Sequence, residues 1–194
     1  MNSELKLGIF GGSFDPVHLG HLLVAQAAVE ELGLDKLFFI PAAQSPFKPE
    51  NQPASATVRL QLLRLALAGK TNFEIDEQEI RRGGISYTVD TLRDYAKRFP
   101  GVELFYLIGA DNVPKLNEWR EPAELARLAE FVAIPRPGGV VAVFPAPFRG
   151  RMLRGFPFAV SSSEIRARVK ARLTIDNLVP AAVAEAIRNA NIYC

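Results

Sequence analysis

The chain of 194 residues has little of what marks several common protein classes. With the single cysteine Cys194 it cannot form an internal disulfide, which is typical of a reducing, cytoplasmic location. No apolar run is long enough to cross a bilayer, and the polar start Met1–Lys6 is unlike a signal peptide. The net charge is only +2, with no block of lysine and arginine. We therefore expect a single domain over residues 1–194, with no membrane or nucleic-acid partner; the oligomeric state stays open, and an oligomer is possible.

The chain has only two histidines, and both lie in the segment Gly11–His21, directly after the apolar run Leu5–Phe10. The run predicts a buried strand, and the residues after the second histidine predict a helix. A strand, a glycine turn and a helix start bring several backbone N–H groups to one point, which favours anion binding. Because His18 and His21 reach the same point, they indicate phosphate chemistry rather than packing.

Three alternative roles suit this segment less well. The glycine spacing is not the Gly-x-Gly-x-x-Gly of dinucleotide sites, and no Gly-Lys-Ser/Thr follows as it does in a Walker loop. Zinc is a weak alternative, because no third ligand accompanies His18 and His21. A plain tight turn is the remaining alternative, but glycines, Asp15-Pro16 and both histidines coincide at one junction.

Apolar runs that are typical of buried strands alternate with helical patterns along the chain. The predicted strands are Leu5–Phe10, Lys36–Ile40, Phe73–Asp76, Glu103–Ile108, Phe131–Ile134 and Phe156–Ala159. The predicted helices are Gly20–Leu32, Thr57–Ala68, Thr88–Arg98, Pro122–Leu128, Ser162–Arg172 and Pro180–Asn189. This alternation predicts an α/β fold that is doubly wound and Rossmann-like, a mostly parallel sheet with helices on both faces. Ligands of such folds bind beyond the carboxyl ends of the strands.

Two long loops interrupt the pattern. Pro41–Pro53 contains four prolines and one basic residue, Lys48, and Pro135–Gly155 is rich in proline, glycine and arginine. Long loops inside a small domain are often functional, although a plain surface connection is the simpler alternative. We expect the first loop to cover a substrate and leave the role of the second open.

A second candidate anion site is the segment Ser161–Arg166, which follows a predicted strand and opens a predicted helix. Helix capping by Ser161 or Ser162, with Glu164 in a capping box, accounts for some of these residues. Capping does not account for Arg166. Serine hydroxyls, helix N–H groups and a guanidinium together suit a triphosphate.

Two further segments lie at the ends of predicted elements. Ser86–Leu92 opens a helix, where an N-cap at Ser86 or Thr88 is the structural alternative. Gly109 and Asp111 follow a strand, and an acidic residue there can hold ribose hydroxyls.

Trp119, the single tryptophan, has polar neighbours, which favours a partly exposed ring that can stack on a flat heterocycle. A core position is the commoner alternative for a tryptophan.

The sequence Gly-Gly-Ser-Phe-Asp-Pro-Val-His-Leu-Gly-His at residues 11–21 resembles the His-x-Gly-His signature of the nucleotidyltransferase superfamily. Its long form is most similar to that of bacterial nicotinate-nucleotide adenylyltransferases. Val160–Arg166 resembles the Ile-Ser-Ser-Thr-x-Ile-Arg motif of that family, with Val160 and Ser163 as departures. Ser86–Leu92 is similar to its Ser-Tyr-Thr-x-Asp-Thr-Leu. The Gly109…Trp119 spacing and the C-terminal Val179–Tyr193 are also similar to the family pattern.

The resemblance implies adenylyl transfer from ATP to nicotinate mononucleotide, which gives deamido-NAD and pyrophosphate in NAD biosynthesis. The implied catalytic residues are His18, His21 and Arg166. The implied ATP-binding residues are Gly11, Gly12, Ser13, Phe14, His18, His21, Ser161, Ser162, Ile165 and Arg166. The implied mononucleotide-binding residues are Lys48, Tyr87, Thr88, Gly109, Asp111, Trp119 and Arg136. Mg²⁺ is expected to bridge the substrate phosphates, because no dedicated carboxylate cage is evident.

Two alternatives stay open. Another transferase of the superfamily, with a pantetheine-phosphate acceptor or a cytidylyl donor, would keep the histidines but would not account for Trp119 and Ser86–Leu92. A non-catalytic nucleotide-binding module would bind without releasing pyrophosphate. The sequence also does not distinguish nicotinate from nicotinamide mononucleotide.

Overall fold

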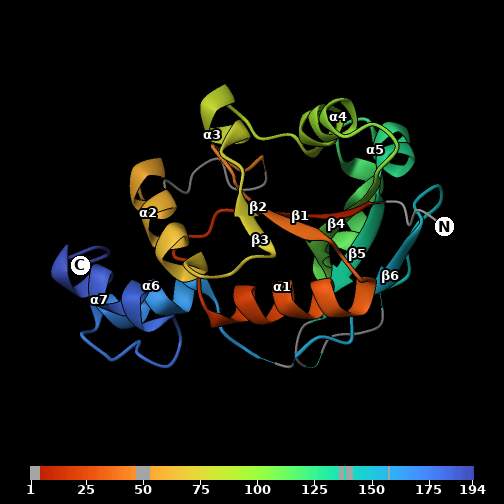
Figure 1. Cartoon of the computed structure of the whole chain (residues 1–194). Helices are drawn as coiled ribbons and strands as arrows, with labels where there is room; N and C mark the ends of the chain where they lie inside the picture. Colours follow the sequence, from red (N-terminus) through yellow and green to blue (C-terminus); the bar gives the residue numbers. More distant parts are fainter. Residues whose placement is uncertain (1–4, 47–52, 136–137, 139–141, 157) are drawn as a thin grey trace.

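A six-stranded sheet runs through the centre of the molecule in the computed structural model, which describes residues 5–46, 53–135, 138, 142–156 and 158–194 (Figure 1). The strands are β1 (Lys6–Gly12), β2 (Lys36–Pro41), β3 (Phe73–Ile75), β4 (Glu103–Gly109), β5 (Glu130–Ile134) and β6 (Gly150–Met152). Their order is β3-β2-β1-β4-β5-β6, and every neighbouring pair is parallel. The predicted doubly wound α/β fold is confirmed. The chain changes direction across the sheet between β1 and β4, and ligands of such folds bind at that point.

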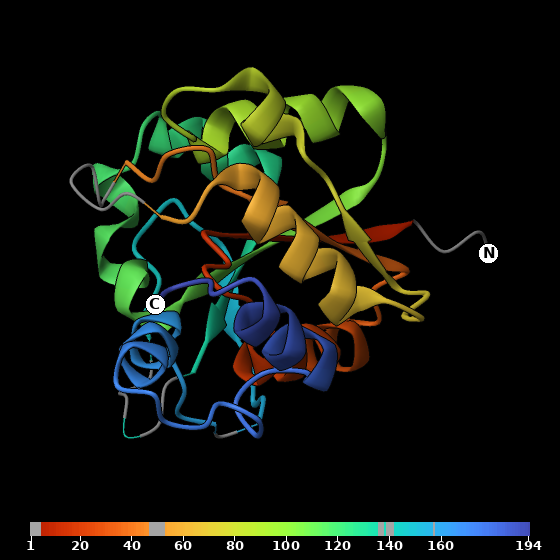
Figure 2. The same cartoon turned by 90° about the vertical axis from the view of Figure 1, so that its left-hand side faces the viewer.

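Helices cover both faces of the sheet (Figures 1 and 2). They are α1 (Leu19–Leu32), α2 (Ala56–Leu67), α3 (Gln78–Arg82), α4 (Thr88–Arg98), α5 (Pro122–Leu128), α6 (Ser162–Lys170) and α7 (Ala181–Asn189), with a 3₁₀ helix η1 (Ala110–Glu118). Apolar residues of α1, α2, α6 and α7 form one core, and those of α4, α5 and η1 form the other. The sequence predicted six of these helices but neither α3 nor η1.

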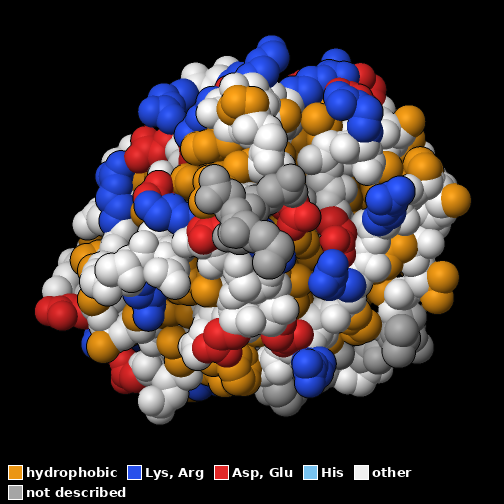
Figure 3. Space-filling model, turned by 45° about the vertical axis from the view of Figure 1, so that its right-hand side comes forward, with side chains coloured by type: hydrophobic (Ala, Val, Ile, Leu, Met, Phe, Trp, Pro, Cys, Tyr) orange, Lys and Arg blue, Asp and Glu red, His pale blue; other side chains and the backbone are white. Residues whose placement is uncertain are grey.

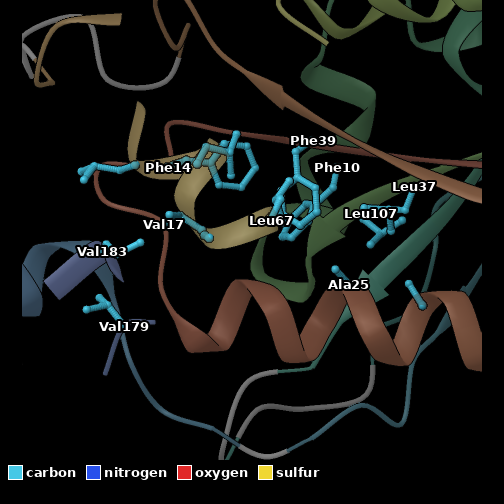
Figure 4. Packing of buried hydrophobic residues seen from close by; sticks show 14 of the residues in the cluster. Phe10, Phe14, Val17, Ala25, Leu37, Phe39, Leu67, Leu107, Val179 and Val183 are labelled. Carbon is cyan, nitrogen blue, oxygen red and sulfur yellow. The ribbon is translucent and has the colours of Figure 1, made fainter. Parts of the chain in front are cut away.

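The strands supply alternate residues to the two cores, as expected when both faces of a sheet are covered. In β1, Ile9 belongs to one core and Phe10 to the other. Figure 4 shows the core above α1, where Phe10, Phe39 and Leu107 of three neighbouring strands lie over Ala25. Burial on both faces explains why the strands appear in the sequence as almost unbroken apolar runs.

The predicted sixth strand, Phe156–Ala159, is wrong. The edge strand is instead β6, which lies inside the second predicted loop and pairs with β5. Beyond β6 the chain leaves the sheet, because the N–H groups of Arg154 and Gly155 donate to the Glu31 carboxylate at 2.9 and 2.8 Å. Phe156, which suggested a buried strand, is exposed.

On the face of the molecule that Figure 3 shows, Lys and Arg side chains are dispersed, with Asp and Glu side chains between them. Within the part of the chain that the structure describes, no helix combines the length and the apolar character needed to cross a membrane.

Candidate active site

The histidine turn, residues Gly12–His21, joins the carboxyl end of β1 to α1. His18 is the extended N-cap residue of α1, and His21 lies in the first turn of the helix. Nδ1 of His21 accepts the backbone N–H of His18 at 3.2 Å, and the two rings stack with their centroids 3.7 Å apart. Because this Nδ1 is an acceptor, a neutral His21 carries its proton on Nε2. It can therefore donate a hydrogen bond to a ligand while uncharged.

The protein around the two imidazoles favours their neutral forms. Burial lowers the pKa of His18 to about 4. Burial, and then the neighbouring His18, hold the pKa of His21 well below its usual 6.5. Nδ1 of His18 is buried and has no hydrogen-bond partner among the described residues. In the ligand-free protein both rings are thus neutral at pH 7, and a bound polyanion would raise both pKa values.

Two glycines let other groups approach the histidine turn closely. A Cβ on Gly20 would lie 3.0 Å from Nδ1 of His18 and 3.1 Å from Val160. A Cβ on Gly11, at the end of β1, would lie 2.7 Å from the hydroxyl of Tyr106. Any larger residue at either position would displace a group of the candidate site.

The start of α6 lies against the histidine turn. Nη1 of Arg166 donates to the carbonyl of Asp15 at 2.7 Å, and the hydroxyl of Ser162 donates to the carbonyl of Pro16 at 2.9 Å. The hydroxyl of Ser161 accepts the N–H at position 164 at 3.2 Å, so this serine caps α6. Segments about 150 residues apart therefore meet at the turn.

Of three other predicted ATP-site residues, Ile165 and Phe14 are buried and Ser13 is exposed. The side chain of Ile165 is fully buried in the core, so only its backbone could meet a ligand. Phe14 is also buried, and its backbone has a positive φ of 47°. Ser13 gives its carbonyl to the guanidinium of Arg59 at 2.7 Å.

Arg59 of α2 is a buried residue that the sequence did not indicate as part of the site. Besides the carbonyl of Ser13, its guanidinium binds the carbonyls of Ala42 and Ala54 at 2.9 and 3.0 Å. It thus holds both ends of the connection between β2 and α2 against the histidine turn. The available signal was its position in the predicted helix, in register with apolar residues, where a charge is out of place.

A small pocket of about 100 Å³ lies beside η1, α4 and α5. Its lining residues are Pro46, Tyr87, Thr88, Glu118, Trp119, Arg120 and Leu125. The half-buried ring of Trp119 meets the rings of Tyr106 and Phe131 edge to face, at centroid distances of 6.4 and 6.2 Å. The pocket brings together three predicted mononucleotide-site residues, Tyr87, Thr88 and Trp119.

Two charged residues of this pocket were not among the predicted ones. The guanidinium of Arg120 lies 4.7 Å from the centre of the Tyr87 ring and forms ion pairs with Asp90 and Glu121 at 3.9 and 3.7 Å. Glu118 lines the pocket beside it. Their position on either side of the tryptophan was the signal in the sequence.

Tyr106 of β4 connects this pocket to the end of β1, where the histidine turn begins. Its hydroxyl is 3.2 Å from Oγ1 of Thr88 and also lies close to Gly11. Gly109 ends β4, and Asp111 is exposed in the first turn of η1. Two other predicted residues, Lys48 and Arg136, lie outside the described residues.

Two other features do not coincide with the predicted site. A hollow of about 600 Å³ between α1 and the segment Gly69–Phe73 contains none of the predicted site residues. Across residues 5–46, 53–135, 138, 142–156 and 158–194, no group of three or more His, Cys, Asp or Glu side chains could hold a metal ion.

Comparison with known sequences adds a family and close relatives. The cytidylyltransferase-like family matches residues 9–168. A probable nicotinate-nucleotide adenylyltransferase of Opitutus terrae is 43% identical over 191 residues, which cover 97% of this chain and 98% of the relative. One of Geobacillus kaustophilus is 40% identical over 188 residues, which cover 97% of this chain and 86% of the relative.

Comparison with solved structures agrees in fold. The structure of Plasmodium falciparum nicotinic acid mononucleotide adenylyltransferase complexed with NaAD matches with a TM-score of 0.79 and 16% sequence identity. The match covers 97% of each chain. At this identity the likeness supports the same doubly wound fold over the whole length.

Proposed function

The chain belongs to the cytidylyltransferase-like family, and we propose that it acts as a nicotinate-nucleotide adenylyltransferase in NAD biosynthesis. In this reaction ATP and nicotinate mononucleotide give deamido-NAD and pyrophosphate. Relatives of that name are about 40% identical over nearly the whole chain. The structural observation that carries the proposal is the meeting of Arg166 with the turn that bears His18 and His21. Tyr106 connects the pocket of Trp119 to the end of β1, where this turn begins.

The chemistry asks the protein mainly to position two anions. An oxygen of the 5′-phosphate of the mononucleotide forms a bond to the α-phosphorus of ATP. The bond from that phosphorus to the α,β-bridging oxygen breaks, and its electron pair leaves with pyrophosphate. A phosphate monoester, with a second pKa of about 6, is already anionic at neutral pH and needs no strong base. Positioning and charge stabilisation are therefore the main contributions of the protein.

The residues of the histidine turn suit the charge that builds on the triphosphate. His18 and His21 donate ring N–H groups to the α- and β-phosphate oxygens. Arg166 and the first N–H groups of α6 hold the β- and γ-phosphates. The hydroxyls of Ser161 and Ser162 already serve the cap and the Pro16 carbonyl, which favours backbone contacts from these two serines.

The pocket suits the acceptor. Trp119 presents a half-buried ring for stacking on the pyridine, and Thr88 lies beside it at the start of α4. Gly109 ends β4 and Asp111 follows it, at the kind of strand end where ribose hydroxyls are commonly held. We expect Mg²⁺ to be bound mainly by phosphate oxygens, where it would neutralise part of the triphosphate charge. This expectation fits the donor set, since the described side chains offer no group of three metal ligands.

The proposed function is tested with the purified protein and a crossed set of substrates. ATP or CTP is combined with nicotinate mononucleotide, nicotinamide mononucleotide or phosphopantetheine, and pyrophosphate and the coupled product are measured. We expect the highest kcat/KM for ATP with nicotinate mononucleotide. A preference for CTP or for phosphopantetheine would identify another transferase of the superfamily. Nucleotide binding without pyrophosphate release would identify a non-catalytic module.

A further inference from the structure

Asp15 is a buried carboxylate in the histidine turn, three residues before His18. Its Oδ1 accepts the hydroxyl proton of Tyr193 at 2.8 Å and the N–H of Ala54 at 3.2 Å. Nη1 of Arg166 lies 3.5 Å from the other carboxylate oxygen. A buried charge is costly unless it is paired and hydrogen-bonded. These three partners therefore decide where the Asp15 side chain lies.

The C-terminal part of the chain holds the backbone on both sides of His18. Before the histidine, Tyr193 fixes the side chain of Asp15, and α6 holds the carbonyls of Asp15 and Pro16. After it, the N–H of Leu19 donates to the carbonyl of Leu178 at 3.0 Å. Residues that follow the last substrate-binding motif in the sequence thus determine how α1 begins.

Among these anchors, Tyr193 is the one that acts through its side chain and belongs to no proposed phosphate-binding group. It is next to the last residue and lies half-buried against the core. Burial, and then the hydrogen bond to Asp15, raise the pKa of Tyr193 well above its ordinary value of 10. The hydroxyl is therefore a permanent donor at physiological pH, and it can be removed without removing a ligand of ATP.

We propose that Tyr193 is a positioning residue for adenylyl transfer, whose hydroxyl holds Asp15 and thereby sets the direction in which His18 and His21 present their donors. This inference rests on the proposed adenylyltransferase function. A displacement of about 1 Å in a catalytic group can cost about 100-fold in rate. The Tyr193 hydroxyl is one of three partners of the Asp15 side chain, so its removal should displace the turn by less than about 1 Å. We therefore expect kcat to fall about 10-fold.

The test is the Tyr193→Phe variant, which keeps the ring and removes only the hydroxyl. We expect kcat to fall about 10-fold while KM for nicotinate mononucleotide stays within about twofold, because the acceptor pocket is untouched. The two histidines also give a direct readout, since a ¹H–¹³C NMR spectrum of the imidazoles contains only two sets of ring signals. Both sets should shift in the variant even without substrate.

The matched control is Tyr95→Phe. Tyr95 also donates to a buried aspartate, Asp76, at 2.9 Å, but it lies about two turns along α4 from Thr88 and has no proposed substrate contact of its own. Both variants should lower the melting temperature, and only Tyr193→Phe should lower kcat and move the histidine signals. A kcat within about twofold of wild type, or an equal loss in both variants, would overturn the proposal. Absence of wild-type turnover would count against the proposed function instead, because the NMR comparison needs no turnover.

A second variant tests the same contact from its other partner. Asp15→Asn keeps the shape of the side chain and weakens the bond to Tyr193. In the Asp15→Asn background, the further change Tyr193→Phe should lower kcat by less than about twofold, since the two residues act as one unit. A further 10-fold loss would show that the hydroxyl acts elsewhere. If Tyr193→Phe does not fold, the Asp15→Asn variant alone must show the loss in kcat without a change in KM, and an unchanged kcat contradicts the proposal.

Discussion

Two buried aspartates, Asp15 and Asp76, are surrounded by the same kinds of side chain. Each is 5% exposed. Each accepts a tyrosine hydroxyl, Asp15 from Tyr193 at 2.8 Å and Asp76 from Tyr95 at 2.9 Å. Each also has an arginine nitrogen 3.5 Å from a carboxylate oxygen. Side-chain chemistry alone therefore does not distinguish the histidine turn from an ordinary structural cluster.

The two clusters differ in where their partners lie in the sequence. Gln78, Tyr95 and Arg98 bind Asp76 from 2, 19 and 22 positions away. That cluster fastens α3 and α4 to the end of β3. The partners of Asp15 are 39, 151 and 178 positions away. A short-range cluster can secure neighbouring helices, whereas the long-range one brings distant segments to the turn that carries the histidines.

The largest expected effect is a loss of activity when a residue of the histidine turn is changed. His18→Ala or His21→Ala removes one preorganised donor, so kcat should fall by about 10²–10³-fold. The folded state should persist, because each imidazole is held neutral in a place where its charged form is disfavoured. Steady-state pyrophosphate release measures the loss, and urea unfolding checks the fold. Unchanged turnover in either variant would exclude that histidine from catalysis.

The two regions should affect the free energy of unfolding in different pH ranges. Between pH 6.5 and about 4, unfolded His18 binds a proton that the folded protein does not bind, so the free energy of unfolding falls as the pH falls. For His18 alone the full change is roughly 3 kcal/mol. Burial alone would raise the pKa of Asp76, but the hydrogen bonds from Arg98 and Tyr95 outweigh it and lower that pKa. The stability that Asp76 contributes is therefore lost only below its ordinary value of 3.8.

Urea titrations at a series of pH values measure these two windows. His18→Asn should flatten the dependence between pH 6.5 and 4 by about one proton. Asp76→Asn should leave that window unchanged and alter the dependence only at lower pH. The assignment fails if the His18 variant keeps the wild-type slope.

The next effect is on stability alone. Asp76→Asn leaves the Arg98 guanidinium and the buried Tyr95 hydroxyl with a weaker acceptor, so the free energy of unfolding should fall by about 1–3 kcal/mol. Because the cluster lies on α3 and α4 rather than on the histidine turn, kcat should not change. Chemical unfolding and pyrophosphate release, measured on the same preparation, decide the point. A 10-fold loss of kcat in Asp76→Asn would contradict the view that Asp76 contributes to stability alone, whereas Asp15 also contributes to activity.

Much of the fold was predictable because its signals are local. Thr88–Arg98 and Pro122–Leu128 have the bounds that the sequence predicted, since each starts at a residue that suits a helix N-terminus. The strand Gly150–Met152 was missed because a short edge strand with an arginine has no apolar run. Phe156–Ala159 has an apolar run, but the prediction of a strand there was wrong. The chain leaves the sheet just before it, where two backbone N–H groups donate to the Glu31 carboxylate.

The candidate site was predictable where its residues stand together in a motif, as His18 and His21 do. The contacts that support the turn were not predictable. Arg59 stands out as a charge among the apolar residues of a helix, but the sequence does not show what it binds. Arg59 and Tyr193 act through hydrogen bonds to a carbonyl or a carboxylate far away in the sequence, and such bonds leave no spacing to detect. Only the three-dimensional fold shows that Tyr193 reaches Asp15.

The smallest expected effect concerns the two arginines that stand 3.5 Å from their aspartates. Arg81 is 71% exposed beside Asp76, and Arg166 is 32% exposed beside Asp15. An exposed ion pair contributes little, so Arg81→Ala should change the free energy of unfolding by less than about 0.5 kcal/mol and leave kcat and KM unaltered. Arg166→Ala removes a proposed phosphate ligand and should raise KM for ATP by at least about 10-fold. Equal changes in kcat and KM in both variants would contradict this comparison. They would mean that proximity to a buried carboxylate, and not proximity to the histidine turn, determines whether such an arginine contributes to the reaction.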